Sequence, residues 1–211
     1  MEKRLRAGLF DLDGVILDTE TQYSRFWGMQ GRLAHPELPE FSKMIKGHTL
    51  EEIVETYFPG KEQAEKVIRE IFDFESKMTF DFVPGVMDFA CRLKKEGVRL
   101  AIVTSSNNEK MQNVFRIHPE LTDVFDVMIT ADKISRSKPD PECYLLAAEE
   151  LGVSPGNCSV FEDSFAGLEA GRRAGMFVVG VATTNPAEVI KDKADLVIPD
   201  FMEITSDQLR R

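Results

Sequence analysis

Two aspartates near the N-terminus are one residue apart and are followed at once by a glycine. Asp11 and Asp13 end an apolar run, within the sequence Gly-Leu-Phe-Asp-Leu-Asp-Gly-Val of residues 8–15. Side chains alternate along a strand, so both carboxylates project to one side, at the strand end where parallel sheets place their ligands. Such a pair can supply a nucleophile and an acid/base, with a hard cation between them. The alternative is a solvated turn, since Asp and Gly are common turn residues.

Hydroxyl side chains end a second apolar run. Residues 98–103 are followed by Thr104, Ser105, Ser106 and Asn107. A hydroxyl at such a strand end can hold a phosphate oxygen, and the helix expected next points its free N–H groups the same way. An ordinary helix N-cap is the alternative interpretation of these residues.

A lysine lies in a loop that contains two prolines. Lys138 belongs to the segment Ser-Lys-Pro-Asp-Pro of residues 137–141, in which the prolines restrict the backbone before a predicted helix. A lysine is a compact cation that suits an anionic phosphate and a nearby aspartate. A surface lysine in a proline-rich loop is the alternative.

Two adjacent acids end a further apolar run. Glu162 and Asp163 follow the sequence Cys-Ser-Val-Phe of residues 158–161. Either carboxylate could bind a divalent ion together with Asp11, and ligands that are all oxygen favour Mg²⁺. The alternative is an acidic helix N-cap, because Asp and Glu favour helix starts.

The elements that must position these residues fall into two kinds. Residues 19–32, 50–58 and 62–80 repeat apolar side chains at helical spacing, and this block of about sixty residues contains no convincing strand, which suits a small four-helix bundle. The remainder alternates strands with helices, which predicts a parallel sheet covered on both faces. The predicted strands are residues 5–10, 98–103, 127–129, 158–161, 177–181 and 196–198, and the predicted helices are residues 87–96, 107–115, 141–151, 164–174 and 187–193.

The predicted fold is therefore α/β, a doubly wound parallel-sheet core of Rossmann-like type with an inserted helical-bundle cap. We expect residues 1–14 and 83–211 to form the core and residues 15–82 to form the cap. The hinges between them should lie near residues 15–19 and 81–84. A ligand pocket between two such bodies is a common arrangement.

Composition and net charge argue against several classes of function. The chain has 211 residues, 43% of them hydrophobic, and a net charge of −10, which disfavours binding to nucleic acid or to anionic membranes. No apolar run is long enough for a membrane helix and the start is no secretory signal. The three cysteines are an odd count without metal-type spacing, which argues against a disulfide or zinc framework and favours a cytoplasmic protein. As partners we expect no nucleic acid and no membrane, with the chain a monomer or weak oligomer.

The four motifs, in this order, resemble the haloacid dehalogenase-like hydrolase superfamily of phosphotransferases. The resemblance covers about residues 5–199. The segments FDLDGVILDTE, VTSSN, SKPDP and FEDSFAG, with the position of the insert, are similar to the branch that contains β-phosphoglucomutase and many small-metabolite phosphatases. The resemblance implies a small phosphorylated metabolite as substrate and Mg²⁺ as cofactor.

The resemblance also implies a role for each matching residue. Asp11 would be the nucleophile that forms an aspartyl-phosphate, and Asp13 would protonate the leaving alcohol and then activate water. Thr104 and Lys138 would hold the phosphoryl group, with Ser105 beside them, and phosphoryl transfer depends mostly on such positioning and charge neutralisation. The implied metal ligands are Asp11, Asp13 through its backbone carbonyl, Asp163 and, directly or through water, Glu162.

Two enzyme activities fit this branch. Its mutases carry a histidine in the first cap helix and an arginine that grips a second phosphate, and the positions that match are Tyr23 and Leu50, which cannot do that work. We therefore favour a phosphatase of sugar or nucleoside monophosphates. A β-phosphoglucomutase-type isomerase is the alternative, with His48 or Lys46 as substitutes. A non-catalytic binding protein would lack a motif residue, and none is missing.

Substrate contacts are expected from the cap. An aromatic and basic mixture of side chains would suit a sugar or a nucleoside monophosphate. Arg69 and Lys77 could also reach the cleft, and Phe26 and Trp27 have the alternative of forming the core of the cap. The candidates are Glu20, Tyr23, Phe26, Trp27, Lys46, His48 and Thr49.

Overall fold

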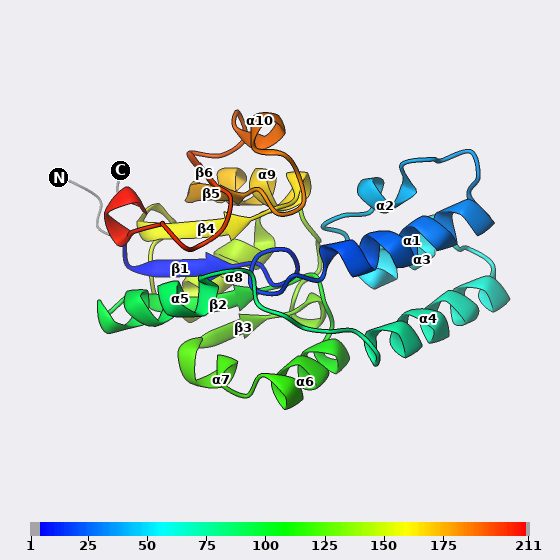
Figure 1. The fold of residues 1–211 in the computed structure, drawn as a ribbon, viewed down its shortest axis with the longest axis horizontal. Coiled ribbons are helices and arrows are strands. Elements are labelled where there is room, and N and C mark those ends of the chain that lie inside the picture. The colour runs from blue at the N-terminus through cyan, green and yellow to red at the C-terminus, as the bar shows by residue number, and fades with distance from the viewer. Residues whose placement is uncertain (1–4, 210–211) are drawn as a thin grey trace.

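The computed structural model describes residues 5–209, whose elements form two bodies side by side (Figure 1). One body is built on a six-stranded sheet. Its strands are β1 (Ala7–Phe10), β2 (Arg99–Val103), β3 (Val127–Ile129), β4 (Cys158–Glu162), β5 (Phe177–Val181) and β6 (Leu196–Ile198). The other body consists of four helices, which we call the cap helices. They are α1 (Glu20–Ala34), α2 (Phe41–Met44), α3 (Leu50–Tyr57) and α4 (Lys61–Glu75).

The sheet body carries the remaining helices. They are α5 (Val86–Lys95), α6 (Asn108–Ile117), α7 (Leu121–Val124), α8 (Glu142–Glu150), α9 (Phe165–Arg173) and α10 (Ala187–Ile190). Three short 3₁₀ helices complete it: η1 (Ala131–Lys133), η2 (Pro155–Asn157) and η3 (Ser206–Leu209). Within residues 5–209, none of the helices has both the length and the apolar character needed to cross a membrane.

All strands of the sheet are parallel, in the order β3-β2-β1-β4-β5-β6. This confirms the doubly wound fold, since the chain runs outward from the centre in both directions. β1 lies between β2 and β4, so that Phe10 is opposite Ile102 and Phe161. The residues after β1 therefore leave the sheet at its centre, at the edge where ligands bind in open α/β folds.

Alternation along the strands divides the core into two layers. Phe10, which is fully buried, packs with α5, α6, α7 and the C-terminal residues in one apolar cluster. Its neighbour Leu9 points to the opposite face and packs with α8 and α9 in a second cluster. Buried parallel strands need apolar side chains on both faces, which explains why their sequences are nearly continuous apolar runs.

The cap helices pack around an apolar cluster of their own, which includes Phe26, Trp27 and Phe41. α4 ends at Glu75, five residues before the predicted end at Phe80. The chain leaves the helix there because the following residues serve the other body: Met78 and Phe80 are buried in the core cluster around β1. The four-residue α2 is too short for a periodic pattern to predict.

The chain passes between the two bodies twice, and the two passages are paired. Leu17 and Phe82 form an antiparallel bridge, and the backbone N–H of Asp18 donates to the carbonyl of Asp81 over 2.8 Å. Both predicted hinges therefore lie side by side. The division into a core of residues 1–14 and 83–211 and a cap of residues 15–82 stays a prediction.

Candidate active site

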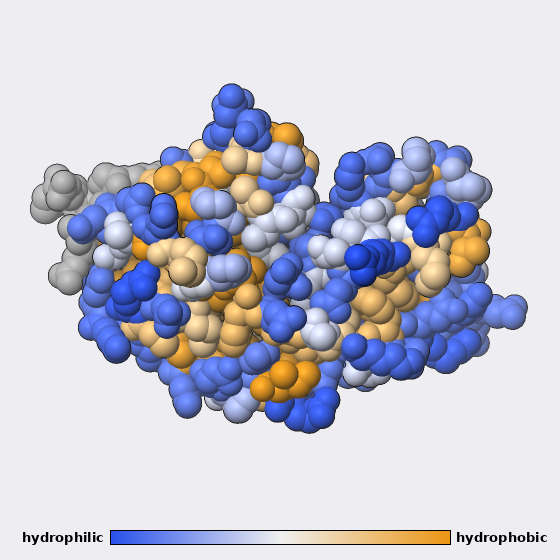
Figure 2. All heavy atoms as spheres, viewed as in Figure 1, coloured by the Kyte–Doolittle hydropathy of each residue, from blue (hydrophilic) through white to orange (hydrophobic). Residues whose placement is uncertain are grey.

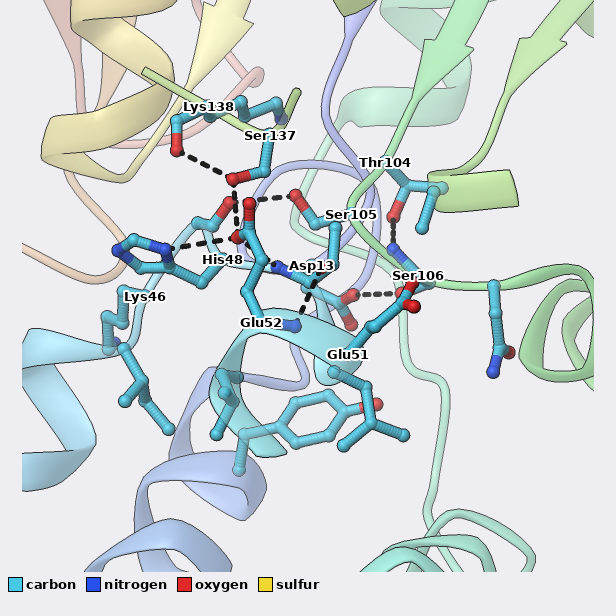
Figure 3. A pocket seen from close by; sticks show the side chains of 18 of the residues that line it. Asp13, Lys46, His48, Glu51, Glu52, Thr104, Ser105, Ser106, Ser137 and Lys138 are labelled. Carbon is cyan, nitrogen blue, oxygen red and sulfur yellow. Dashed lines mark hydrogen bonds and ion pairs between the residues drawn. The ribbon is translucent and has the colours of Figure 1, made fainter. Parts of the chain in front are cut away.

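A cavity of about 760 Å³ lies between the carboxyl edge of the sheet and the cap helices. Figure 2 shows a notch between the two bodies on one face of the molecule, and Figure 3 shows core side chains facing Lys46, His48 and Glu52 across the cavity. Most residues predicted as site residues line it; Glu162 and the cap residues Phe26, Arg69 and Lys77 do not. Those that line it are Asp11, Asp13, Glu20, Tyr23, Trp27, Lys46, His48, Thr49, Thr104, Ser105, Lys138 and Asp163.

Asp11 and Lys138 form a buried ion pair at the cavity floor. Lys138 Nζ donates to Asp11 Oδ1 over 2.8 Å, and the lysine side chain is 2% exposed. Burial raises the pKa of Asp11 to about 7, with Lys138 lowering it and Glu162 raising it. Burial alone would lower the pKa of Lys138, but the two carboxylates raise it above its ordinary value, so the ammonium stays charged. A fixed cation therefore lies beside the candidate nucleophile.

Glu162 anchors that lysine. Its Oε1 accepts hydrogen bonds from Lys138 Nζ over 2.6 Å and from the Tyr144 hydroxyl over 2.8 Å. Its Oε2 accepts from the backbone N–H of Asp163 over 3.0 Å, and from the N–H and hydroxyl of Ser164 over 3.1 Å and 3.0 Å. Glu162 is fully buried, and donors occupy both of its oxygens. Together these contacts hold the carboxylate in one position.

Asp13 is held by three donors. Its Oδ1 accepts from the Thr19 hydroxyl over 2.5 Å, and its Oδ2 accepts from the Ser106 hydroxyl over 3.1 Å and from Lys110 Nζ over 2.5 Å. The Asp13 side chain keeps 18% of its surface exposed to the cavity, against 3% for Lys110. The carboxylate is thus fixed in direction while remaining accessible.

Lys110 was missed by the sequence interpretation. It lies in the first turn of α6, where the helix dipole disfavours a cation, and this unfavourable placement was the available signal for a carboxylate partner. Its ammonium also lies 4.5 Å from the centre of the Tyr23 ring, whose hydroxyl donates to Glu75 Oε1 over 2.7 Å. Lys110 therefore contacts both the core aspartate Asp13 and the cap helices.

The polar residues after β2 divide between the cavity and the cap. The buried Thr104 hydroxyl accepts from the backbone N–H of Ser106 over 3.0 Å, which leaves its own proton free to bond a ligand. The Ser105 hydroxyl, in contrast, donates to the Gly47 carbonyl of the cap segment over 2.9 Å. Asn107 caps α6, as the alternative interpretation expected. In this arrangement the Thr104 hydroxyl is free to donate and the Ser105 hydroxyl is engaged, and the phosphate-binding roles of both residues stay predictions.

Three buried carboxylates could hold a metal ion. Among residues 5–209, Asp11, Glu162 and Asp163 offer oxygens within 4.8 Å of one another, and such oxygens suit a hard cation like Mg²⁺. Gly14, with φ of +78°, leaves room beside them, since a Cβ there would lie 2.2 Å from Asp163 Oδ2. Burial and the charge of Glu20 raise the pKa of Asp163, so a cation at this place would be strongly favoured. The residues present fit Mg²⁺.

The loop after β5 donates hydrogen bonds to residues at the carboxyl edge of the sheet. The Thr183 hydroxyl donates to the Gly14 carbonyl over 2.5 Å, the Thr184 hydroxyl donates to the Asp163 carboxylate, and the Asn185 amide donates to the Asp163 carbonyl over 2.9 Å. These residues were not singled out from the sequence. The signal was available in the run of polar side chains that follows a predicted strand.

Most predicted cap contacts lie at the cavity, already engaged with neighbours. Lys46 is ion-paired with Glu20, and His48 Nδ1 lies 3.2 Å from Glu52 Oε2. The Thr49 hydroxyl accepts from the Glu52 backbone N–H and caps α3. Each of these polar groups is thus positioned by a partner.

Four further residues of the predicted cap differ in whether they line the cavity. Phe26 belongs to the apolar cluster of the cap helices, whereas Trp27 belongs to that cluster and also lines the cavity. Arg69 and Lys77 do not line the cavity and form ion pairs within α4 and its C-terminal turn, with Glu65 and Asp73.

Comparisons with known proteins agree with this geometry. The family model described as haloacid dehalogenase-like hydrolase matches residues 9–181. β-Phosphoglucomutase of Bacillus subtilis is 32% identical over 219 residues, which cover 97% of this chain and 94% of that protein. Hexitol phosphatase A of Escherichia coli is 30% identical over 209 residues, which cover 96% of this chain and 94% of that protein.

Solved structures of similar fold belong to the same family. A family IA hydrolase of variant 3 from Entamoeba histolytica superposes with a TM-score of 0.80 at 25% identity, covering 97% of both chains. The β-phosphoglucomutase from Clostridium difficile superposes with a TM-score of 0.78 at 29% identity, covering 95% of this chain and 93% of that one. Since several of the sequence relatives are named as phosphatases, an enzyme that hydrolyses phosphoric monoesters is supported.

Proposed function

The chain belongs to the haloacid dehalogenase-like hydrolase family, and on this premise we propose that it is a Mg²⁺-dependent phosphatase of small phosphorylated metabolites. Membership of the family confirms the resemblance drawn from the four motifs. The proposed reaction passes through a phosphoryl group carried on Asp11. The observation that carries this proposal is the Asp11 carboxylate on the cavity floor, 2.8 Å from the buried Lys138 ammonium.

The proposed chemistry has two steps. An oxygen of Asp11 attacks phosphorus, the bond from phosphorus to the substrate oxygen breaks, and Asp13 gives its proton to the leaving alkoxide. Water then attacks the same phosphorus and passes a proton to Asp13, and the bond to Asp11 breaks to release phosphate. Lys138 and the Thr104 hydroxyl would hold the phosphoryl oxygens through both steps.

The carboxylates next to Asp11 have separate proposed tasks. Asp11, Asp163 and the Asp13 carbonyl would hold Mg²⁺, which when bound supplies positive charge opposite the phosphoryl oxygens. Glu162 belongs to the same acidic group, yet both of its oxygens already accept hydrogen bonds. Its contribution is therefore best described as holding Lys138, with any contact to the ion made through water.

The names of relatives favour carbohydrate phosphates. One is named hexitol phosphatase A, one from Thermotoga maritima is named phosphorylated carbohydrates phosphatase, and one from Streptomyces hygroscopicus is named validoxylamine A 7′-phosphate phosphatase. The cap side of the cavity offers the Glu20–Lys46 ion pair and the His48 imidazole, together with the indole of Trp27. Hydroxyl groups of a sugar or polyol monophosphate are suitable partners for such a surface.

The alternative activity is a mutase, which the name of the Bacillus subtilis relative favours. A mutase has to bind a second phosphate in the cavity. Tyr23 directs its hydroxyl to Glu75, and Leu50 packs in the cap cluster, so neither offers a cation at the positions expected for one. Lys46 and His48 already face carboxylates. These contacts favour hydrolysis over transfer to a second sugar oxygen.

The test is phosphate release from a panel of sugar, polyol and nucleoside monophosphates with Mg²⁺. Asp11→Asn provides the blank, and a chelator should abolish release from the native chain. Release that depends on Asp11 supports the phosphatase and names its substrate class. Interconversion of glucose 1-phosphate and glucose 6-phosphate, primed with the bisphosphate and with little free phosphate, would instead establish the mutase.

A further inference from the structure

We propose that Lys110 is a positioning residue that directs the Asp13 carboxylate for proton transfer, and that Tyr23 and Glu75 of the cap helices complete this arrangement. The inference rests on the proposed function, in which Asp13 is the acid/base. It assigns a task to a buried lysine outside the four motifs.

The core side of this arrangement is rigid. Lys110 Nζ donates to Asp13 Oδ2 over 2.5 Å, and the lysine side chain is 3% exposed. The Asn107 side chain accepts from the Lys110 backbone N–H over 3.0 Å, which fixes the start of α6. With Thr19 bonded to Oδ1, both oxygens of Asp13 have a donor that sets their direction.

The cap side covers the same ammonium. The Tyr23 ring of α1 lies 4.5 Å from Lys110 Nζ, within the range of a cation–π contact. The Tyr23 hydroxyl donates to Glu75 Oε1 at the end of α4, and Asn113 of α6 donates to the Glu75 carbonyl over 3.4 Å. Two cap helices therefore contact the helix that carries Lys110, and the lysine side chain is buried between them and the sheet body while Asp13 stays accessible from the cavity.

Local preferences alone do not explain a lysine here. Burial of an ammonium is unfavourable without a charged partner, and a cation in the first turn of a helix opposes the helix dipole. Among the ion pairs of residues 5–209, the carboxylate that pairs with Lys110 is Asp13. A neutral side chain at this position would leave Asp13 with two hydroxyl donors, which can rotate, in place of a fixed cation.

The two chemical steps make different demands on Asp13. An alkyl phosphate needs a proton on its leaving oxygen, whereas p-nitrophenolate leaves without one. Hydrolysis of the aspartyl-phosphate on Asp11 needs a base for either substrate. If Lys110 positions Asp13, its loss should slow both steps with a sugar phosphate, but only the second step with p-nitrophenyl phosphate.

The experiment compares Lys110→Met with the native chain by steady-state and rapid-mixing kinetics. We expect kcat for a sugar phosphate to fall by about 100-fold, with KM changed by less than about threefold. With p-nitrophenyl phosphate we expect a burst of one nitrophenolate per enzyme, followed by slow turnover. Lys94→Met, which removes a lysine paired with Asp126 away from the cavity, should behave as the native chain.

A double-mutant cycle separates positioning from general loss of structure. Lys110→Met should cause almost no further loss in an Asp13→Asn background, because the group on which it acts is gone. Tyr23→Phe should lower kcat in the same way but to a smaller extent. If Lys110→Met fails to fold, Lys110→Gln takes its place. Unchanged kcat and no burst, or an equal loss in the Asp13→Asn background, would overturn the inference. Absence of Asp11-dependent phosphate release by the native chain would instead overturn the proposed function.

Discussion

The hydroxyl of Ser137 donates a hydrogen bond to Glu52 Oε2 over 2.5 Å, which ties the loop that carries Lys138 to cap helix α3 (Figure 3). The same Glu52 carboxylate accepts from the Thr49 backbone N–H and completes the capping box of α3. The start of a cap helix and the loop that carries Lys138 therefore share one carboxylate. A change in the position of the cap must break or remake this contact.

Ser137→Ala should weaken closure of the cap over the substrate. A hydrogen bond to a charged group contributes about 1.5–3 kcal/mol, so we expect KM to rise by about tenfold or more. The chemistry after closure uses other residues, so kcat should change little. Ser76→Ala, which removes a hydroxyl bonded to the Asp73 carbonyl within the cap, is the matched control. Equal KM values for Ser137→Ala and the native chain would contradict the prediction.

The metal-free protein should lose stability as the pH rises from about 4 to about 7. Burial raises the pKa of Asp11 from 3.8 to about 7, and burial with the charge of Glu20 raises that of Asp163. In this window the folded protein binds more protons than the unfolded chain, so the free energy of unfolding falls as the pH rises. The expected loss is on the order of a few kcal/mol.

Urea unfolding in a chelator at about pH 5 and about pH 7.5 measures this slope. Asp163→Asn should make it shallower, because one of the two carboxylates with a raised pKa is removed. Mg²⁺ should stabilise the protein more at the higher pH, where Asp11 is more fully ionised and fewer protons compete with the cation. A native chain that gains stability over this range without metal would count against the prediction.

Gly167→Ala should strongly reduce activity. A Cβ at this position would lie 1.8 Å from Glu162 Oε1, the oxygen that holds Lys138, so Glu162 has to move. Lys138 then loses one of its two carboxylate partners and its fixed position beside Asp11. We expect phosphate release to fall by at least about 100-fold.

Gly28→Ala is the control for that substitution. Gly28 lies inside α1, and the nearest atom to its added Cβ is 3.6 Å away, at the end of the Arg32 side chain. Alanine favours a helix interior over glycine, so the free energy of unfolding should rise by about 0.5–1 kcal/mol. Activity should be retained. Comparable inactivation by both changes would show that the contact with Glu162 is not the cause.

Ser159→Ala should stabilise the protein. In the part of the chain that the structure describes, the Ser159 hydroxyl is the buried polar side-chain atom without a hydrogen-bond partner, and the residue is 1% exposed in β4. Removing an unsatisfied buried hydroxyl should raise the free energy of unfolding by about 1 kcal/mol, measured by thermal or urea unfolding. Ser164→Ala should have the opposite effect, because that hydroxyl caps α9 and donates to Glu162.

Much of the fold was predictable because parallel strands and amphipathic helices have clear periods. All six strands were predicted to within two residues at every end, and Val127–Ile129, Phe177–Val181 and Leu196–Ile198 were predicted exactly as observed. The strand order could not be obtained from apolar runs, since each strand is equally buried. The end of α4 was placed too late because Met78 and Phe80 continue the apolar spacing while packing in the other body.

The site was predictable where its residues follow strands. Asp11, Thr104 and Asp163 come together because parallel strands end at one edge of the sheet. Lys110 was missed because its partner Asp13 lies 97 residues away and on another element, a relationship that no local pattern contains. The direction of a side chain could not be predicted either. The Ser105 hydroxyl, for example, donates to the backbone carbonyl of Gly47.

The bridge between Leu17 and Phe82 has a consequence for how such enzymes diversify. The two ends of the segment that carries α1–α4 lie side by side, so the sheet accommodates that segment as it would a hairpin loop of any size. A graft of a different helical insert at this junction would leave β1 and its neighbours in register. If the proposed roles hold, we expect that substrate choice in the insert and phosphoryl chemistry in the sheet body can be changed separately at this bridge.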